Sequence, residues 1–133
     1  MIYIVLNFLP IAVAMVAGLL IGVVWLRASH ILLPGWGWFA LAALSEFWLA
    51  SILAGALILA PSQAGEWTMA LGSAFVIWIG FVLPAVAVTL GVHGMARGQV
   101  ISAVIHWLVV MLIQAAILQA WGLAAPPGAP GAG

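Results

Sequence analysis

Four long apolar segments dominate this sequence of 133 residues. They cover residues 2–26, 36–60, 67–91 and 99–121, and each reaches the roughly 20 residues that an α-helix needs to cross a bilayer. The connections between them are short and rich in proline and glycine, so successive helices must run in opposite directions. The sequence therefore predicts an all-α integral membrane protein, a single domain over residues 1–123 that forms a bundle of four antiparallel transmembrane helices.

The composition supports a lipid environment and excludes several classes of function. Hydrophobic residues make up 68% of the chain and charged residues 3%, whereas a soluble domain carries about 25% charged residues. So few charges cannot form a basic nucleic-acid-binding surface, and the absence of cysteine excludes thiolate metal sites. We predict no metal site and no cofactor. The lipid bilayer is the expected partner, and assembly into a homo-oligomer or a larger membrane complex stays open.

The two arginines of the chain indicate its orientation. Arg27 follows the first segment and Arg97 precedes the fourth, so both belong to connections that lie at the same end of an antiparallel bundle. Loops that carry basic residues stay in the cytoplasm. We expect a multi-pass protein of the bacterial cytoplasmic (inner) membrane with both termini on the non-cytoplasmic side. The final stretch, 124–133, is rich in proline, glycine and alanine and is expected to be disordered.

Small residues recur at helical spacing on two of the segments. They are Ala14, Gly18 and Gly22 in the first segment and Gly72 and Gly80 in the third. Small residues that share one face let a second helix approach closely, so we expect these five to mediate helix packing. Pro84, further along the third segment, removes a helix hydrogen bond and predicts a local distortion.

Tryptophans occur both at the ends of the segments and in their middle. Those near the ends, such as Trp25 and Trp36, are expected to form an aromatic belt at the membrane interface. Those near mid-depth are Trp48, Trp78 and Trp107. They either pack between helices or face lipid.

Glu46 is the one acidic residue in the interior of an apolar segment. A carboxylate at this depth costs about 2.5–3.5 kcal/mol, taking the insertion value for aspartate as a guide. At 100° per residue it shares a helix face with Ala43, Ala50 and Ala54, and small residues of this kind face other helices. A polar partner is therefore expected opposite Glu46.

The fourth segment supplies candidate partners for Glu46. Its polar stripe consists of Gln99, Ser102, His106 and Gln114. Counted at 1.5 Å per residue from the helix starts, Glu46 lies about 15 Å deep and His106 about 11 Å deep. We therefore predict an intramembrane pair of Glu46 and His106.

Further polar residues are expected to support this pair or to form separate contacts. Ser45 and Ser102 flank the pair, while Asn7 is expected to approach Gln114 or Gln119 near the opposite end of the bundle. His93 and Arg97 are expected to form a second polar cluster at the cytoplasmic mouth.

Several roles remain open for the two central residues. Glu46 either forms a structural hydrogen bond, serves a proton, an ion or a ligand, or contacts another subunit. His106 is either a hydrogen-bonded structural histidine or a ligand for a haem or chlorophyll metal.

Two stretches carry a family resemblance. Trp78-Ile-Gly-Phe-Val-Leu-Pro84 and Ile101-Ser-Ala-Val-Ile-His-Trp-Leu-Val109 resemble the small bacterial membrane proteins of the domain of unknown function 1761. The resemblance implies four membrane spans within about this chain length. It also implies that a histidine at the position of His106 is usual, whereas Glu46 matches no residue of the family pattern. The family's role is unestablished.

Enzyme motifs are absent from the sequence. There is no His-Glu-x-x-His, no Gly-x-Ser-x-Gly and no phosphate-binding loop, so we expect no catalytic residue. The sequence favours a non-enzymatic accessory or assembly subunit that acts through helix–helix contacts. The alternatives are a small proton-coupled transporter that uses Glu46, and a protein that binds a membrane cofactor or lipid ligand at His106.

Overall fold

A computed structural model of the chain describes residues 2–33, 35–61 and 64–127. All regular structure in these ranges is helical, which confirms the predicted all-α class. The elements in chain order are α1 (Ile2–Leu6), α2 (Phe8–Ala28), α3 (Trp36–Leu59), α4 (Glu66–Ile77), the π-helical segment η1 (Trp78–Val82), α5 (Leu83–Val92) and α6 (Arg97–Trp121). Because α4, η1 and α5 form one continuous span, the described residues contain four helices long and apolar enough to cross a membrane.

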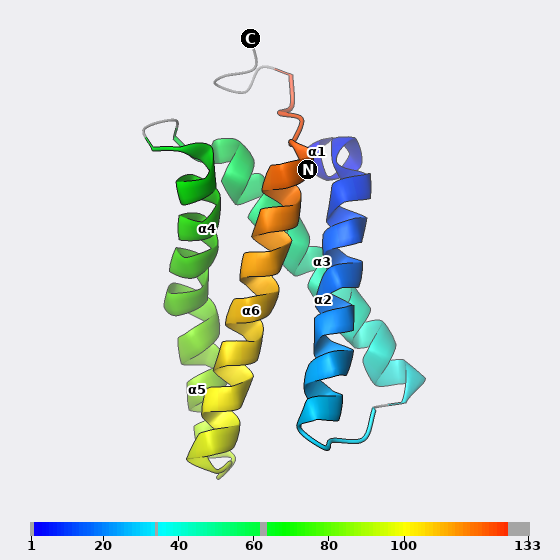
Figure 1. Cartoon of the computed structure of the whole chain (residues 1–133), viewed down its shortest axis with the longest axis vertical. Helices are drawn as coiled ribbons and strands as arrows, with labels where there is room; N and C mark the ends of the chain where they lie inside the picture. The colour runs from blue at the N-terminus through cyan, green and yellow to red at the C-terminus, as the bar shows by residue number, and fades with distance from the viewer. Residues whose placement is uncertain (1, 34, 62–63, 128–133) are drawn as a thin grey trace.

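Helix α6 occupies the centre of the bundle. It packs against α2 on one side and against α4, η1 and α5 on the other, while α3 crosses obliquely behind it (Figure 1). Within the described residues, α2 has no contact with the third span. Helix α6 is therefore in contact with each of the other three spans, and α3 also packs against α2.

Fully buried alanine residues lie where α3 crosses α2 and α6. Ala50 and Ala54 of α3 are fully buried there, together with Ala14 of α2 and Ala115 of α6. Alanine side chains at a crossing point allow the helix backbones to approach closely. Towards its N-terminus α3 carries bulky aromatic residues instead, and it diverges from α6 (Figure 1).

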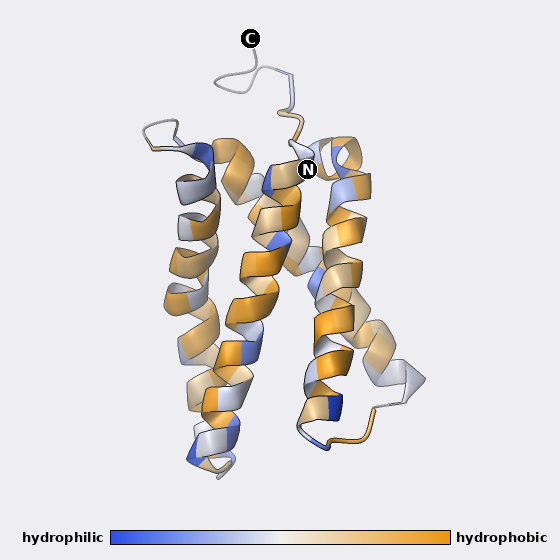
Figure 2. Cartoon of the chain, in the orientation of Figure 1, coloured by the Kyte–Doolittle hydropathy of each residue, from blue (hydrophilic) through white to orange (hydrophobic). Residues whose placement is uncertain are grey.

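Hydrophobic residues predominate along the spans (Figure 2), and many of them are exposed on the outside of the bundle. Large hydrophobic side chains such as Val5, Leu20 and Phe81 are more than half exposed on three different parts of the chain. Such a surface is stable only against lipid, so the chain is a multi-pass integral membrane protein.

The third span contains a π-helical segment just before Pro84. A proline ring clashes with the carbonyl group four residues earlier and provides no N–H for the helix, and the wider π turn accommodates both effects. The distortion expected from Pro84 takes this form. The indole Nε1 of Trp78 donates a hydrogen bond to the carbonyl oxygen of Val104 at 2.9 Å, which ties this segment to α6.

The packing role predicted for Gly72 and Gly80 is wrong for contacts within the described chain. Both glycines are exposed, and a Cβ atom at either position would meet nothing within 4 Å. The third span faces its neighbours instead through Ala70, Ala74 and Trp78, which are also spaced by four residues but lie on another face of the helix.

Candidate functional site: an intramembrane cavity

A cavity of about 510 Å³ lies between α2, α6 and the N-terminal half of α3. It forms where α3 diverges from α6, and its lining is mostly apolar. Leu33 and Gly35 in the first loop and Trp36 at the start of α3 line its outer end. Glu46 and His106 are the two titratable residues in its lining.

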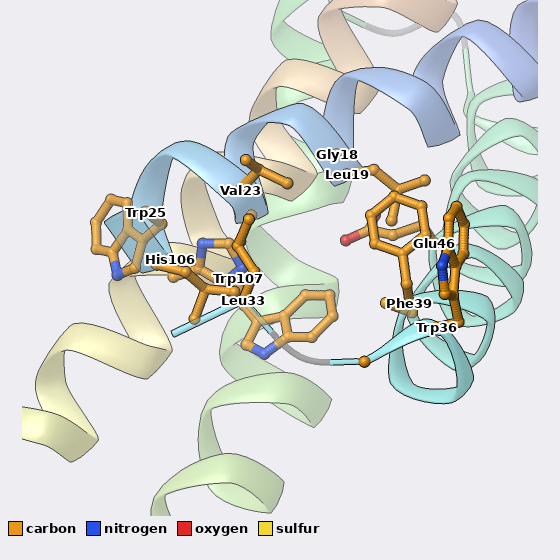
Figure 3. Close-up of a pocket in the computed structure, with 14 residues that line it drawn as sticks. Gly18, Leu19, Val23, Trp25, Leu33, Trp36, Phe39, Glu46, His106 and Trp107 are labelled. Carbon is orange, nitrogen blue, oxygen red and sulfur yellow. The ribbon is translucent and has the colours of Figure 1, made fainter. Parts of the chain in front are cut away.

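Figure 3 shows the labelled side chains in two groups that face each other across this cavity. One group includes Trp25, His106 and Trp107, and the other includes Trp36, Phe39 and Glu46. An oxygen of Glu46 points into the space between the groups. The two residues of the predicted pair, Glu46 and His106, therefore line the same cavity but lie on opposite walls.

The hydrogen-bond partner of Glu46 is Gln114, and the structure corrects the predicted Glu46–His106 pair in this respect. Gln114 Nε2 donates to Glu46 Oε2 at 2.6 Å and also lies 3.3 Å from the carbonyl oxygen of Ala14. Glu46 is 4% exposed and Gln114 is fully buried. The carboxyl group is therefore anchored on α6 about two helical turns further along than His106, at the inner end of the cavity.

Gly18 provides the space for this hydrogen bond. A Cβ atom at this position would lie 2.7 Å from Glu46 Cδ and 2.9 Å from Gln114 Nε2, closer than real Cβ contacts. Gly22, one turn further along α2, lines the cavity, and its nearest neighbour would be His106 Cε1 at 4.0 Å. The small-residue stripe of α2 thus leaves room for polar side chains of the other helices, besides allowing close approach of backbones.

His106 lies between two tryptophan rings. Its ring centroid is 5.4 Å from that of Trp25 and 5.5 Å from that of Trp107. Its Nδ1 atom is buried and has no hydrogen-bond partner among the described residues. The residue therefore belongs to an aromatic wall and does not neutralise Glu46.

Trp25 is part of the cavity wall. From the sequence it was expected only in an aromatic belt at the membrane interface. Its indole Nε1 donates a hydrogen bond to Ser102 Oγ at 3.1 Å, which links α2 to α6. Ser102 therefore supports the tryptophan and has no bond to Glu46. Ser45 does not support Glu46 either, because its exposed hydroxyl donates to the carbonyl oxygen of Leu41 in its own helix at 2.8 Å.

Asn7 forms contacts other than those expected. Its Nδ2 donates to the carbonyl oxygens of Tyr3 at 2.8 Å and Ala124 at 2.9 Å, and its Oδ1 accepts the N–H of Ala124 at 2.8 Å. The expected contact with Gln114 or Gln119 is absent in the described residues, since Gln119 donates to Glu66 Oε2 at 3.2 Å. We call the hydrogen bonds between Asn7 and Ala124 the Asn7 clasp; they hold Ala124, the first residue of the predicted disordered tail, in place. Residues 128–133 of that tail lie outside the described residues.

The expected cluster of His93 and Arg97 has no hydrogen bond between its members in the part of the chain that the structure describes. Both residues are exposed at the end of the bundle near the third connection. His93 Nδ1 lies 2.7 Å from the carbonyl oxygen of Thr89 in its own helix. The two residues therefore lie at helix ends on the surface, and they do not form a polar binding site together.

The described residues contain no group of three or more histidine, cysteine, aspartate or glutamate side chains placed to hold a metal ion. The cavity instead offers a carboxyl oxygen, a histidine ring and several indole and phenyl faces. These groups can bind an organic molecule through hydrogen bonds and stacking.

The fold defines a helical multi-pass membrane protein, and a mostly apolar cavity lies between three of its helices. In comparisons with known proteins, no family model, no curated protein and no solved structure matches the chain. The resemblance to the domain of unknown function 1761 stays a prediction.

Proposed function

We propose that this membrane protein binds a small, largely apolar molecule in the cavity between α2, α3 and α6. The cavity itself supports this proposal, since its volume of about 510 Å³ lies in the range of about 300–1,000 Å³ typical of small-molecule sites. Its apolar lining with a few convergent polar groups is also typical of such sites. This function corresponds to the ligand-binding and transport alternatives more closely than to a purely structural subunit.

Replacement of Gly22 by leucine tests the proposal. Gly22 lines the cavity and has no close neighbour, so a leucine side chain there fills the space without displacing Glu46. Gly98→Leu is the matched control, because it makes the same change at an exposed position of α6 that has open space around it and does not line the cavity. Both variants keep the apolar character of a membrane helix.

Two aromatic probes of nearly equal size, 1-naphthylmethanol and 1-naphthylmethylamine, serve as ligands. Their binding to the protein in phosphatidylcholine nanodiscs is measured by equilibrium dialysis, with empty nanodiscs as the blank. We expect saturable binding of at least one probe to the wild type and to Gly98→Leu, and its loss in Gly22→Leu. Absence of saturable binding, or binding that survives Gly22→Leu, would overturn the proposal.

A second candidate function, an accessory or assembly subunit, draws support from the outward-facing glycines of the third span. Gly72 and Gly80 leave an uncovered small-residue face that a helix of a second copy or of another membrane protein can approach closely. Native mass spectrometry from mild detergent tests this candidate. Oligomers that dissociate in Gly72→Leu would support it, whereas a monomer without co-purifying proteins would exclude it.

We infer that the protein resides in the cytoplasmic membrane of a bacterium, with its first and third connections in the cytoplasm. Arg27 in the last turn of α2 and Arg97 at the start of α6 support this orientation through the positive-inside rule. The chain lacks cysteine, so Ser29→Cys and Ala64→Cys each introduce a single thiol at opposite ends of the bundle. In intact cells a membrane-impermeant maleimide should label Ala64→Cys and spare Ser29→Cys, and the reverse pattern would invert the orientation.

A further inference from the structure

We propose that the ligand of this cavity carries a basic nitrogen, and that its ammonium group binds the carboxyl oxygen of Glu46 that faces the cavity. This inference rests on the proposed function and names the chemical class of the ligand. An aromatic or aliphatic amine, with its apolar part against the tryptophan and phenylalanine rings, is the molecule that the site fits.

The first argument is the unused hydrogen-bonding capacity of Glu46. Gln114 donates to Oε2, whereas the other carboxyl oxygen has no hydrogen bond with any described residue. Glu46 also points an oxygen into the cavity in Figure 3. An ionised carboxylate only accepts hydrogen bonds, so a molecule bound beside it must supply a donor.

The second argument is that the protein itself supplies no basic partner for this carboxyl group. The chain has two basic side chains, Arg27 and Arg97, and both are exposed near the ends of their helices. His106 stands on the opposite wall of the cavity. A carboxylate inside a membrane is as a rule paired with a group of opposite charge. A cationic ligand would provide the positive charge that no side chain places beside Glu46.

The third argument is the composition of the walls. Trp36 and Phe39 lie on the same side as Glu46, and Trp25 and Trp107 face them across the cavity (Figure 3). Faces of aromatic rings attract cations and stack against flat apolar groups. The combination of one carboxyl group with aromatic rings favours a lipophilic amine over an anion, which Glu46 would repel.

The amine headgroup of a lipid is a second source of the same chemistry. Such a headgroup also carries a phosphate, and the cavity lining contains no lysine or arginine to bind it. The site therefore suits a free amine better than an aminophospholipid. Nanodiscs made with and without phosphatidylethanolamine distinguish the two sources, because a headgroup that binds at Glu46 would compete with an added amine.

The affinities of 1-naphthylmethylamine and 1-naphthylmethanol for the wild type test the inference without any variant. At neutral pH the amine is a cation and the alcohol is neutral, while their ring systems are identical. In phosphatidylcholine nanodiscs we expect the amine to bind about tenfold more tightly or better, as a charge-assisted hydrogen bond would provide. Equal affinities, or tighter binding of the alcohol, would overturn the inference.

The variant Glu46→Gln locates the preference on the carboxyl group. Glutamine keeps the size of the side chain and an oxygen that can accept the bond from Gln114. In Glu46→Gln we expect the preference for the amine to disappear, while the affinity for the alcohol changes less than about twofold. The control is Glu66→Gln, which alters an exposed carboxyl group at the start of α4 and should leave the affinities for both probes unchanged. A preference that persists in Glu46→Gln contradicts the assignment.

The two proposals fail in distinguishable ways. If both probes bind equally and Gly22→Leu abolishes their binding, the cavity is a small-molecule site without selectivity for amines. If neither probe binds saturably, both proposals fall. Loss of amine binding when phosphatidylethanolamine is added assigns the site to the lipid headgroup and overturns the choice of a free amine.

Discussion

Gln114 Nε2 donates a 2.6 Å hydrogen bond to Glu46 Oε2 and so joins two helices through residues that are 68 positions apart in the chain. Both side chains are buried within the membrane-spanning part of the bundle. The bond holds the carboxyl group at the inner end of the cavity. It also connects the stability of the α3–α6 crossing with the position of the group that we propose to bind the ligand.

Gln114→Leu should destabilise the protein by about 1–3 kcal/mol, because it leaves the buried carboxyl group of Glu46 without its donor. The double variant Glu46→Leu with Gln114→Leu should recover part of this loss, since neither polar group is then left alone. Reversible unfolding in mixed detergent micelles measures both. Ser45→Ala is the control, as its hydroxyl bonds only within its own helix and is exposed. A single variant no less stable than this control would contradict the role of the bond.

Gly18→Ala should also destabilise the protein, although alanine favours helix more than glycine does. The added methyl group would lie 2.7 Å from Glu46 Cδ and 2.9 Å from Gln114 Nε2, so one side chain must leave its position. Overpacking of this kind costs about 1–3 kcal/mol. In the same unfolding assay, Gly22→Ala should be at least as stable as the wild type, since the nearest neighbour of its methyl group would be 4.0 Å away. Equal stability of the two variants would refute the steric argument.

The helical class and the number of spans could be predicted from the sequence because both follow from the length and polarity of its apolar segments. The partner of Glu46 could not be predicted by counting depth from the helix starts. That count assumed spans that begin at one level and run parallel. In the structure α3 crosses the bundle obliquely, and α6 begins further towards this end of the bundle than α3 does (Figure 1). The polar stripe on α6 did contain the true partner, Gln114, alongside the predicted one, His106.

The inward faces of the spans were predictable only in part. Lipid and protein interior are both apolar, so hydrophobic periodicity does not show which face of a membrane helix is buried. The glycine stripe of α2 lies against Glu46 and Gln114, while the equally regular pair Gly72 and Gly80 faces outward. The cavity itself depends on the divergence of α3 from α6, a property of tertiary packing that no local motif records.

Trp78→Phe should lower the stability by about 1–3 kcal/mol because it replaces a buried indole by a smaller ring and removes the hydrogen bond to the carbonyl oxygen of Val104. Trp48 is the matched control: it is also near mid-depth, but it is 46% exposed. The same substitution there should change stability by no more than about 0.5 kcal/mol. Thermal unfolding followed by circular dichroism compares the two. Equal shifts in Tm would show that the link between η1 and α6 adds nothing beyond an ordinary tryptophan.

Asn7→Ala should release the chain that follows α6. The side chain of Asn7 makes two hydrogen bonds with the backbone of Ala124 and one with Tyr3, so its loss frees the N–H and the carbonyl group of Ala124 together. Hydrogen exchange at Ala124, followed by mass spectrometry, should accelerate about tenfold, the effect of losing two net hydrogen bonds of ordinary strength. Gln119→Ala serves as the control, since it removes a side-chain bond to Glu66 at the same end of the bundle without touching Ala124. Exchange that is unchanged in Asn7→Ala, or that accelerates as much in Gln119→Ala, would mean that the clasp does not hold this segment.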